Sequence, residues 1–479
     1  METTSTIQQD RSSERPSLRA RIEYRFKLGI AISAIAGIGV CLSWSSTGLP
    51  YLRKLNIIED DQQASLVVSL LPLGAILGSL PVGILADKYG RKIVAWISAM
   101  ALLLSWLIIC FVRNIAVIYA ARFFAGIGCG VASIVAPMYF YEITNHSSQR
   151  RIVHRVHWCL NFGILWPYVI HMLFFNYMDP NGKTFKEPKI LLTLLVSLYS
   201  MAILLLPESP MWLEDRGRKE EAEQAIQKMT GTYIKLDIRE PVQVVGNSGL
   251  RLSAFRTISN KRDVILILSL ITFQQFSGIG PLMLFLMDLD DDILYDSNAF
   301  WSYNCIAFVP MIIAACCNIK LHQWIGEKFI IIITTFLMAL CAFFSFIMTI
   351  IVRSLDFKDG FLSALIPMVS TTVYLTAFHI GLGPIPWIMI GKMFPSNSRK
   401  MMYNLAVTYT WILLFILTQS YVYMMDSMGL PGILLMYVIF NAVIMLLSMC
   451  FVPRRVRKIQ EDILENLDEV HTSIAPSSL

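Results

Sequence analysis

The sequence predicts an all-α integral membrane protein with twelve transmembrane helices in two six-helix bundles. Only 15% of the 479 residues are charged and 55% are hydrophobic, whereas a soluble globular protein carries about 25% charged residues. The apolar residues come in runs of roughly 20, the length with which a helix crosses a bilayer. These runs exclude a large soluble protein with an apolar core. One long polar loop divides the runs six and six.

Each apolar run is expected to be a helix, because backbone amides inside lipid must be satisfied within their own segment. The runs lie at 28–50, 66–86, 93–112, 115–139, 152–174, 190–206, 264–287, 300–319, 329–352, 364–391, 402–425 and 430–452. An even number places both chain ends on the same side of the membrane. The polar first 26 residues contain no apolar stretch, so we expect no cleavable signal peptide.

The basic residues predict that both termini are cytoplasmic, because lysine and arginine collect in inner loops. With the N-terminus inside, the inner loops carry the basic groups of 88–92, 150–155, 216–262, 392–400 and 454–458. The outer loop 288–296 holds five aspartates and no basic residue, although the outer loop 175–189 carries three lysines. We therefore expect a multi-pass protein of the cell membrane.

The predicted domain organisation follows from the central loop. It begins with PESP and continues as RGRKEEAEQAIQKM, whose helix formers favour short helices at the inner membrane surface. The predicted parts are a cytoplasmic tail (1–27), a six-helix bundle (28–206), a linker with short helices (207–262), a second bundle (263–452) and a cytoplasmic tail (453–479). Two such halves predict parallel repeats with a solute site between them at mid-membrane.

The first inner loop reads GILADKYGRK from Gly83. It resembles the signature between helices two and three of the major facilitator superfamily, G-x-x-x-D-R/K-x-G-R/K-R/K. Further motifs, in the order of the chain, resemble the sugar porter family. They are RFFAGIGCG (122–130), PMYFYEI (137–143), PESPMWL (207–213), GRKEEAE (217–223), QQFSGIG (274–280) and GLGPIPW (381–387). WSSTGLP (44–50) is most similar to facilitated trehalose/glucose transporter-like members.

The resemblance implies a neutral solute held by amides and indoles. Such a polyol needs donors and acceptors without net charge, and aromatic faces stack on its C–H surfaces. By resemblance, Gln274 and Gln275 are the leading binding candidates, followed by Trp387 and Trp411. Alternatively, each tryptophan could pack between helices or belong to the aromatic belt at the membrane interface. For the glutamines that alternative is weaker, because an unpaired amide in a membrane helix costs free energy.

Several positions of the expected sugar cradle depart from the family pattern. Gly280 stands where an Asn is usual, His157 and Trp158 replace a Gln-Leu pair, Thr410 replaces an Asn, and His379 stands at the position of a common Glu. These changes remove hydrogen-bonding groups, so another small neutral solute remains an alternative to a sugar. The two histidines could make transport pH-dependent, or each could be a neutral, packed ring.

The resemblance also implies an inner gate of charged residues in the N-terminal half. The family pairs its signature arginine with the glutamate that ends helix four, supported by a further arginine and the PESP glutamate. The matching residues here are Asp87, Arg91, Glu142, Arg150 (or Arg151) and Glu208.

In the C-terminal half the corresponding charges have exchanged signs. Glu327 stands where the family has Arg, and Lys392 stands where it has Glu. We expect Glu327 to contact Lys392, with Arg399 as a further candidate partner. The final motif also carries Arg454 where the family has an acidic residue.

No acidic residue lies mid-span in any predicted helix, and Ser45 stands roughly where proton-coupled relatives place an Asp. Ionisable residues within spans usually mark ion pathways, so we expect passive transport by rocking of the two halves. The leading interpretation is a uniporter of a hexose or trehalose. The alternatives are a facilitator of another neutral solute and a nutrient sensor with little flux. We expect no enzymatic activity, cofactor, metal site or nucleic-acid partner; the partners are the solute and the bilayer.

Overall fold

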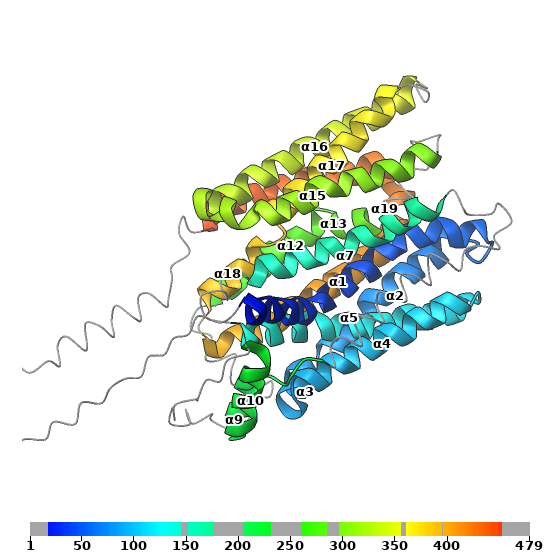
Figure 1. Cartoon of the computed structure of the whole chain (residues 1–479). Coiled ribbons are helices and arrows are strands. Elements are labelled where there is room, and N and C mark those ends of the chain that lie inside the picture. Colours follow the sequence, from blue (N-terminus) through cyan, green and yellow to red (C-terminus); the bar gives the residue numbers. More distant parts are fainter. Residues whose placement is uncertain are drawn as a thin grey trace, which may run out of the picture.

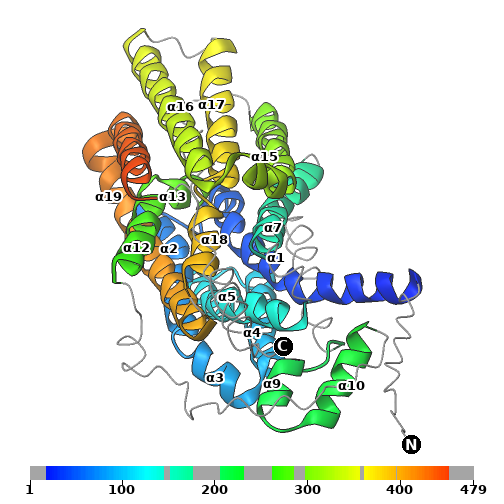
Figure 2. The same cartoon turned by 90° about the vertical axis from the view of Figure 1, so that its left-hand side faces the viewer.

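The computed structural model describes residues 18–144, 152–175, 205–230, 261–284, 297–355, 361–394 and 396–452, and in these ranges the regular structure is entirely helical. Figure 1 shows the long helices running side by side, as segments that cross one bilayer must. Figure 2 views them end-on, with α15, α16 and α17 on one side of the molecule and α3 and α4 on the other.

The N-terminal half begins inside the predicted cytoplasmic tail, because α1 already starts at Leu18. Its helices are α1 (Leu18–Lys54), α2 (Asp61–Ser79), α3 (Val82–Tyr89), α4 (Arg91–Phe111), α5 (Ile115–Ile143) and α7 (Ile152–Phe175). Side-chain capping marks the start of α2, where Asp60 accepts a hydrogen bond from the Gln63 amide at 2.6 Å. The predicted sixth span, 190–206, lies almost wholly outside the described residues.

The linker contains two short helices, α9 (Pro210–Asp215) and α10 (Lys219–Thr230). Ser209 caps α9 by accepting a hydrogen bond from the Trp212 amide, and Pro210 occupies the first turn, where its missing N–H costs nothing. The Trp212 indole then donates to the Asp87 carbonyl at 2.9 Å. The linker is therefore attached to the end of the bundle that carries the first inner loop (Figure 2).

The C-terminal half consists of α12 (Lys261–Phe276), α13 (Ile279–Leu284), α15 (Ser297–Ile325), α16 (Glu327–Leu355), α17 (Phe361–Ile380), α18 (Ile385–Met393) and α19 (Ser396–Phe451). The last run joins the two final predicted spans across a break at Gly429, where φ is 64° and ψ is 176°. By length and composition, eight helical stretches of the described residues could cross a membrane. The predicted spans in α7, α15 and the second part of α19 are also helical.

Small residues bring α2 and α5 into direct backbone contact. A Cβ at Gly126 would lie 2.1 Å from the Leu71 carbonyl oxygen, and one at Gly130 would lie 2.1 Å from that of Ala75. Helices in lipid gain little from burying apolar side chains against each other, so close backbone packing of this kind stabilises their association. The pattern of RFFAGIGCG is thus explained by helix packing.

Many large apolar side chains lie on the outside of the bundle, including Phe111, Phe344, Ile439 and Leu446. This surface is suited to lipid rather than water. Three cysteines, Cys316, Cys317 and Cys450, are also exposed. Within the described parts of the chain, no cluster of histidine, cysteine or acidic residues has the geometry of a metal site.

Candidate functional site

Two interrupted helices carry the residues predicted to bind solute. α12 and α13 are separated at Ser277 and Gly278, where Gly278 has a φ of +89°. α17 and α18 are separated by the turn 381–384. In membrane transporters such breaks expose backbone groups where they line a solute pathway. Backbone carbonyls of the second break thereby lie beside Gln274 of α12.

Gln274 connects the two breaks. Its side-chain nitrogen donates to the carbonyls of Leu382 and Gly383, at 2.9 and 3.2 Å. Its side-chain oxygen is buried and has no hydrogen-bond partner. A buried amide oxygen without a partner is costly unless something else supplies a donor. Gln274 therefore has an acceptor available for a hydroxyl group.

His157 and His379, from opposite halves of the chain, contact each other directly. Nδ1 of His379 and Nε2 of His157 lie 2.8 Å apart, so one ring nitrogen donates and the other accepts. Both side chains are buried, and a Cβ at Gly383 would lie 2.9 Å from the His157 ring. The pair thus adjoins the carbonyl that accepts from Gln274. The sequence placed both histidines in the cradle but did not predict their contact.

Gln275, at the end of α12, and Gly280, at the start of α13, lie close together across the break between these helices. Gln275 is buried, and its Oε1 is 3.7 Å from the position of a Cβ at Gly280. The same Cβ would lie 2.4 Å from a methyl group of Leu414, in α19. An asparagine, usual here in the family, would therefore clash with Leu414 in this arrangement. The apolar side chain of Leu414 occupies that space instead.

The two predicted tryptophans make contacts among α5, α18 and α19. Trp387 packs against Tyr403 with ring centroids 5.5 Å apart. Trp411 donates its indole N–H to Ser133 Oγ at 3.3 Å, and Tyr403 donates to the Ser133 carbonyl at 3.3 Å. Both hydrogen bonds join the C-terminal half to α5 of the N-terminal half. Trp411 thus contacts the N-terminal half directly, whereas Trp387 packs against Tyr403, which does so.

A buried arginine in α5 was not among the predicted site residues. The Arg122 guanidinium is fully buried and donates to the carbonyls of Val67 and Cys41, at 3.1 and 3.0 Å. It also donates to Ser45 Oγ at 2.5 Å and lies over the Trp44 ring. All of these partners are neutral. A single charged residue within an apolar run was the available sequence signal, because such residues usually mark function.

The residues of the predicted N-terminal inner gate form one network. Arg91 binds Glu142 through two parallel hydrogen bonds of 2.8 and 2.9 Å, and its guanidinium lies 3.2 Å from Asp87. The side chains of Arg91 and Glu142 are 2% and 1% exposed, so this pair is shielded from water. Ser209 donates to Glu142 at 2.6 Å. Arg150 lies outside the described residues.

Glu208 caps the start of α4. It accepts hydrogen bonds from the backbone amides of Arg91 and Lys92, at 2.9 and 3.1 Å. A carboxylate at this end of a helix is stabilised by free N–H groups and by the helix dipole. The preceding Gly90 has a φ of +97°, and a Cβ there would lie 2.3 Å from the Glu208 carboxylate. Only a glycine at position 90 therefore leaves room for the Glu208 carboxylate at the start of α4.

The gate network reaches the other half through a residue that the sequence did not single out. Lys400, at the start of α19, lies 3.4 Å from Glu142. In the C-terminal half, Lys392 forms an ion pair with Glu327, the contact that the exchanged charges predict. Arg399 instead donates to the Phe394 carbonyl at 3.2 Å.

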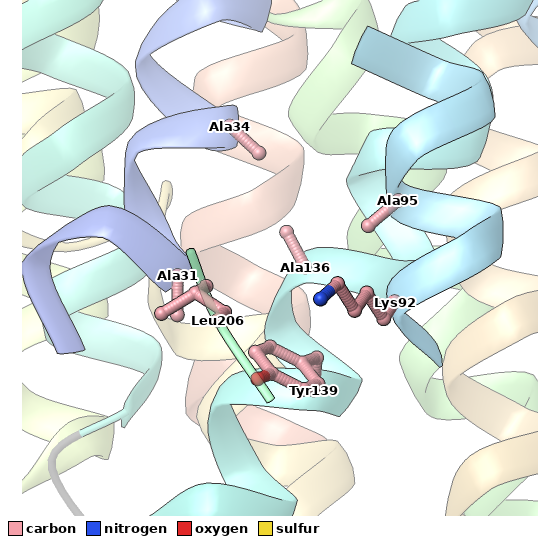
Figure 3. Close-up of a pocket in the computed structure, with 7 residues that line it drawn as sticks. All are labelled: Ala31, Ala34, Lys92, Ala95, Ala136, Tyr139 and Leu206. Atoms are coloured by element: carbon pink, nitrogen blue, oxygen red, sulfur yellow. The ribbon is translucent and has the colours of Figure 1, made fainter. Parts of the chain in front are cut away.

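Figure 3 shows a pocket that adjoins the N-terminal gate network at Lys92. It is enclosed by α1, α4, α5 and Leu206, with the side chains of Lys92 and Tyr139 at its edge. Its volume, ≈ 10 Å³, is on the scale of a single water molecule. It lies within the N-terminal half and lacks the predicted binding residues. We therefore do not assign it to the solute.

Comparison with known proteins identifies the family. The profile described as "Sugar (and other) transporter" matches residues 26–467. The facilitated trehalose transporter Tret1 of Culex quinquefasciatus is 25% identical, over 89% of this chain and 82% of its own length. Tret1 of Drosophila grimshawi is also 25% identical over 91% of this chain, which spans only 47% of that longer relative.

The fold agrees with a solved transporter structure. A partially occluded, inward-open conformation of the xylose transporter XylE from E. coli superposes with a TM-score of 0.72. Its sequence is 19% identical, and the match covers 90% of this chain and 98% of the XylE chain. The chain is therefore a multi-pass membrane protein with the major facilitator fold, and it belongs to the sugar transporter family.

Proposed function

We propose that the chain is a facilitative transporter, a uniporter, of a neutral sugar such as a hexose or trehalose. The observation that carries the proposal is the cradle at the two helix breaks. Gln274 is fixed there by two backbone carbonyls and keeps a buried acceptor without a partner. Neutral donors and acceptors of this kind suit hydroxyl groups. The similarity to Tret1 relatives supports a sugar as the solute.

Passive transport is supported by the surroundings of Arg122. A carboxylate beside this guanidinium would provide a group whose protonation could be coupled to transport. Here the first-helix partner is the Ser45 hydroxyl, which does not titrate. We therefore expect the protein to equilibrate its solute and not to concentrate it.

Alternating access is supported by contacts between the halves at both ends of the bundle. Near the inner gate, Lys400 contacts Glu142; toward the opposite end, Ser69 donates to Gln419 at 2.8 Å. These contacts are small enough to break and reform as the halves rock. We expect the protein in the cell membrane with both termini cytoplasmic.

The direct test is uptake of labelled glucose and trehalose into proteoliposomes, with a panel of other polyols as competitors. We expect saturable uptake that stops at equal concentrations and is unaltered by a protonophore. Gln274→Ala should reduce uptake by up to about tenfold, since it removes the buried acceptor offered to the solute and one hydrogen bond contributes about 0.5–1.5 kcal/mol. Gln227→Ala, on the exposed face of α10, is the matched control. Accumulation above equilibrium would contradict uniport, and uptake of a different polyol alone would exclude a hexose or trehalose.

A further inference from the structure

Four of the seven histidines of the chain lie together where the two halves meet. His154 and His157 are on α7 of the N-terminal half, while His322 is on α15 and His379 is on α17. We call these four residues the histidine cluster. The rings of His154 and His322 have centroids 5.3 Å apart, and those of His157 and His379 are 4.9 Å apart. Each pair joins one half to the other.

All four side chains are at most 8% exposed. Backbone contacts hold the rings of the C-terminal half in position. His322 donates from Nε2 to the Ile380 carbonyl at 2.8 Å, and the His379 carbonyl accepts from Asn318 at 3.0 Å. One ring nitrogen in each of three histidines is buried without a hydrogen-bond partner: Nδ1 of His154, Nδ1 of His322 and Nε2 of His379. The rings are therefore held in fixed positions, and the cluster has ring nitrogens that could bind protons.

The charged groups around the cluster come from few elements. The charges of Glu327 in α16 and Lys392 in α18 interact electrostatically with both His154 and His322. Glu327 and Lys392 also form an ion pair with each other. Arg155, on α7 itself, lies over the Phe140 ring of α5. Between residues 28 and 50, α1 carries no charged side chain.

The charges of α5 and α15 are directed elsewhere. On α5, Arg122 is bound by neutral groups around Ser45, and Glu142 is bound by Arg91. On α15, Lys320 is exposed. On α17, His379 is the one residue of Phe361–Ile380 that can become a cation. No carboxylate other than the already paired Glu327 thus acts on the described cluster to stabilise imidazolium ions.

Protonation of the histidine rings changes the contacts within the cluster. In the His157–His379 contact one nitrogen must donate and the other must accept, which two neutral rings can achieve. If both rings are protonated, both facing nitrogens are donors, and the hydrogen bond is replaced by repulsion between two cations. The same repulsion acts between His154 and His322. Water-exposed imidazoles bind protons near pH 6.5, so separating the halves favours proton uptake.

We propose that the histidine cluster is a proton-sensitive part of the inner gate, closed while its rings are neutral and opened toward the cytoplasm when they bind protons. It regulates the solute site of the proposed function and rests on that function for its physiological role. Protons are a regulator here, not a transported co-substrate. Each proton taken up on opening should raise the ratio of open to closed protein by up to about tenfold per pH unit.

The test measures conformation without solute. Spin labels at Tyr89→Cys of α3 and Trp324→Cys of α15, both exposed positions on opposite halves, are introduced into the full chain without reactive native cysteines. Their distance distribution is recorded in proteoliposomes between pH 7.5 and 5.5. We expect the longer, open distance to increase as the pH falls. His154→Gln/His322→Gln should weaken the shift, and replacing all four histidines should abolish it.

His471→Gln, outside the described residues, is the matched control and should respond as the unsubstituted chain does. An unsubstituted chain without a pH shift, or a full shift in the fourfold variant, would overturn the proposal. Sugar uptake is measured in parallel. Flux without a pH-dependent distance rejects the gate alone, whereas a pH-dependent distance without sugar flux rejects the proposed transport function alone.

Discussion

Lys400 of α19 and Glu142 of α5 lie 3.4 Å apart, so the carboxylate that binds Arg91 within one half also contacts a cation of the other half. The two contacts differ in their surroundings. The Arg91 and Glu142 side chains are almost fully buried, whereas the Lys400 side chain is 57% exposed. The first contact therefore belongs to the permanent structure of the N-terminal half, and the second can break during transport.

Lys400→Ala should favour the inward-open state modestly. An exposed ion pair contributes about 0–1 kcal/mol, which corresponds to a change of at most about fivefold in the equilibrium between states. The spin-label distance described above would measure this change at pH 7.5. Lys219→Ala, on the exposed start of α10, should leave the distances unaltered. An equal response of the two variants would show that Lys400 has no part in the gate.

Glu142→Gln should destabilise the folded protein far more. It leaves the Arg91 guanidinium buried without its two-bond partner, and removing one member of a buried ion pair costs about 3–5 kcal/mol. Thermal unfolding in detergent, followed by the fraction of protein that stays monodisperse, should show a clear loss. Asp61→Asn, which removes the exposed partner of Arg53, provides the control. A melting temperature like that of the control would contradict a structural role for Glu142.

The reversed charges of the C-terminal half permit a swap experiment. Glu327→Lys and Lys392→Glu each place like charges together where the structure has an ion pair. Either variant should favour the inward-open state and slow uptake, while the double variant should recover most of both. Lys320→Glu, at an exposed position of α15, tests whether any new acidic residue has the same effect. If the double variant is no better than the single ones, the pair does not couple these helices.

Apolar run length and motif order were sufficient to predict the fold. The length of each run matches the thickness of the bilayer, and the lack of water in the bilayer core requires each run to be helical. The same rule could not place the helix breaks, because α13 and α18 continue apolar sequence across Gly278 and the turn 381–384. Nor could it predict that α1 extends back to Leu18, since residues outside the lipid are not bound by that rule.

The candidate site was predictable as a set of residues but not as a set of contacts. The exchanged signs of Glu327 and Lys392 predicted a pair because charge complementarity is visible in sequence. By contrast, the contact of His157 with His379 joins residues 222 positions apart, and no charge or spacing marks it. The hydrogen bond of Trp411 to Ser133 across the interface was not visible in the sequence either. Packing between the halves, which sequence patterns do not encode, makes this difference.

Ser45→Asp should convert the proposed passive transport into transport that depends on protons. The new carboxylate would lie beside the Arg122 guanidinium, where Ser45 Oγ now accepts a hydrogen bond of 2.5 Å. At pH 7.5 the ionised carboxylate pairs with the fixed cation, whereas burial in the apolar span favours the protonated form as the pH falls. Movement of α1 against α5 would then require the carboxylate to be protonated first. Uptake should fall at pH 7.5 and recover as the pH is lowered toward 5.5.

Ser45→Asn separates charge from size in this experiment. It places a neutral amide of nearly the same volume beside Arg122, so uptake should have the pH profile of the unsubstituted chain. Uptake of labelled sugar, with and without a protonophore and an inward proton gradient, distinguishes the two variants. The aspartate variant alone should respond to the gradient, because it alone adds a titratable partner to Arg122. Identical pH profiles for both variants would mean that the Arg122–Ser45 contact does not move during transport, and that passive transport has another cause.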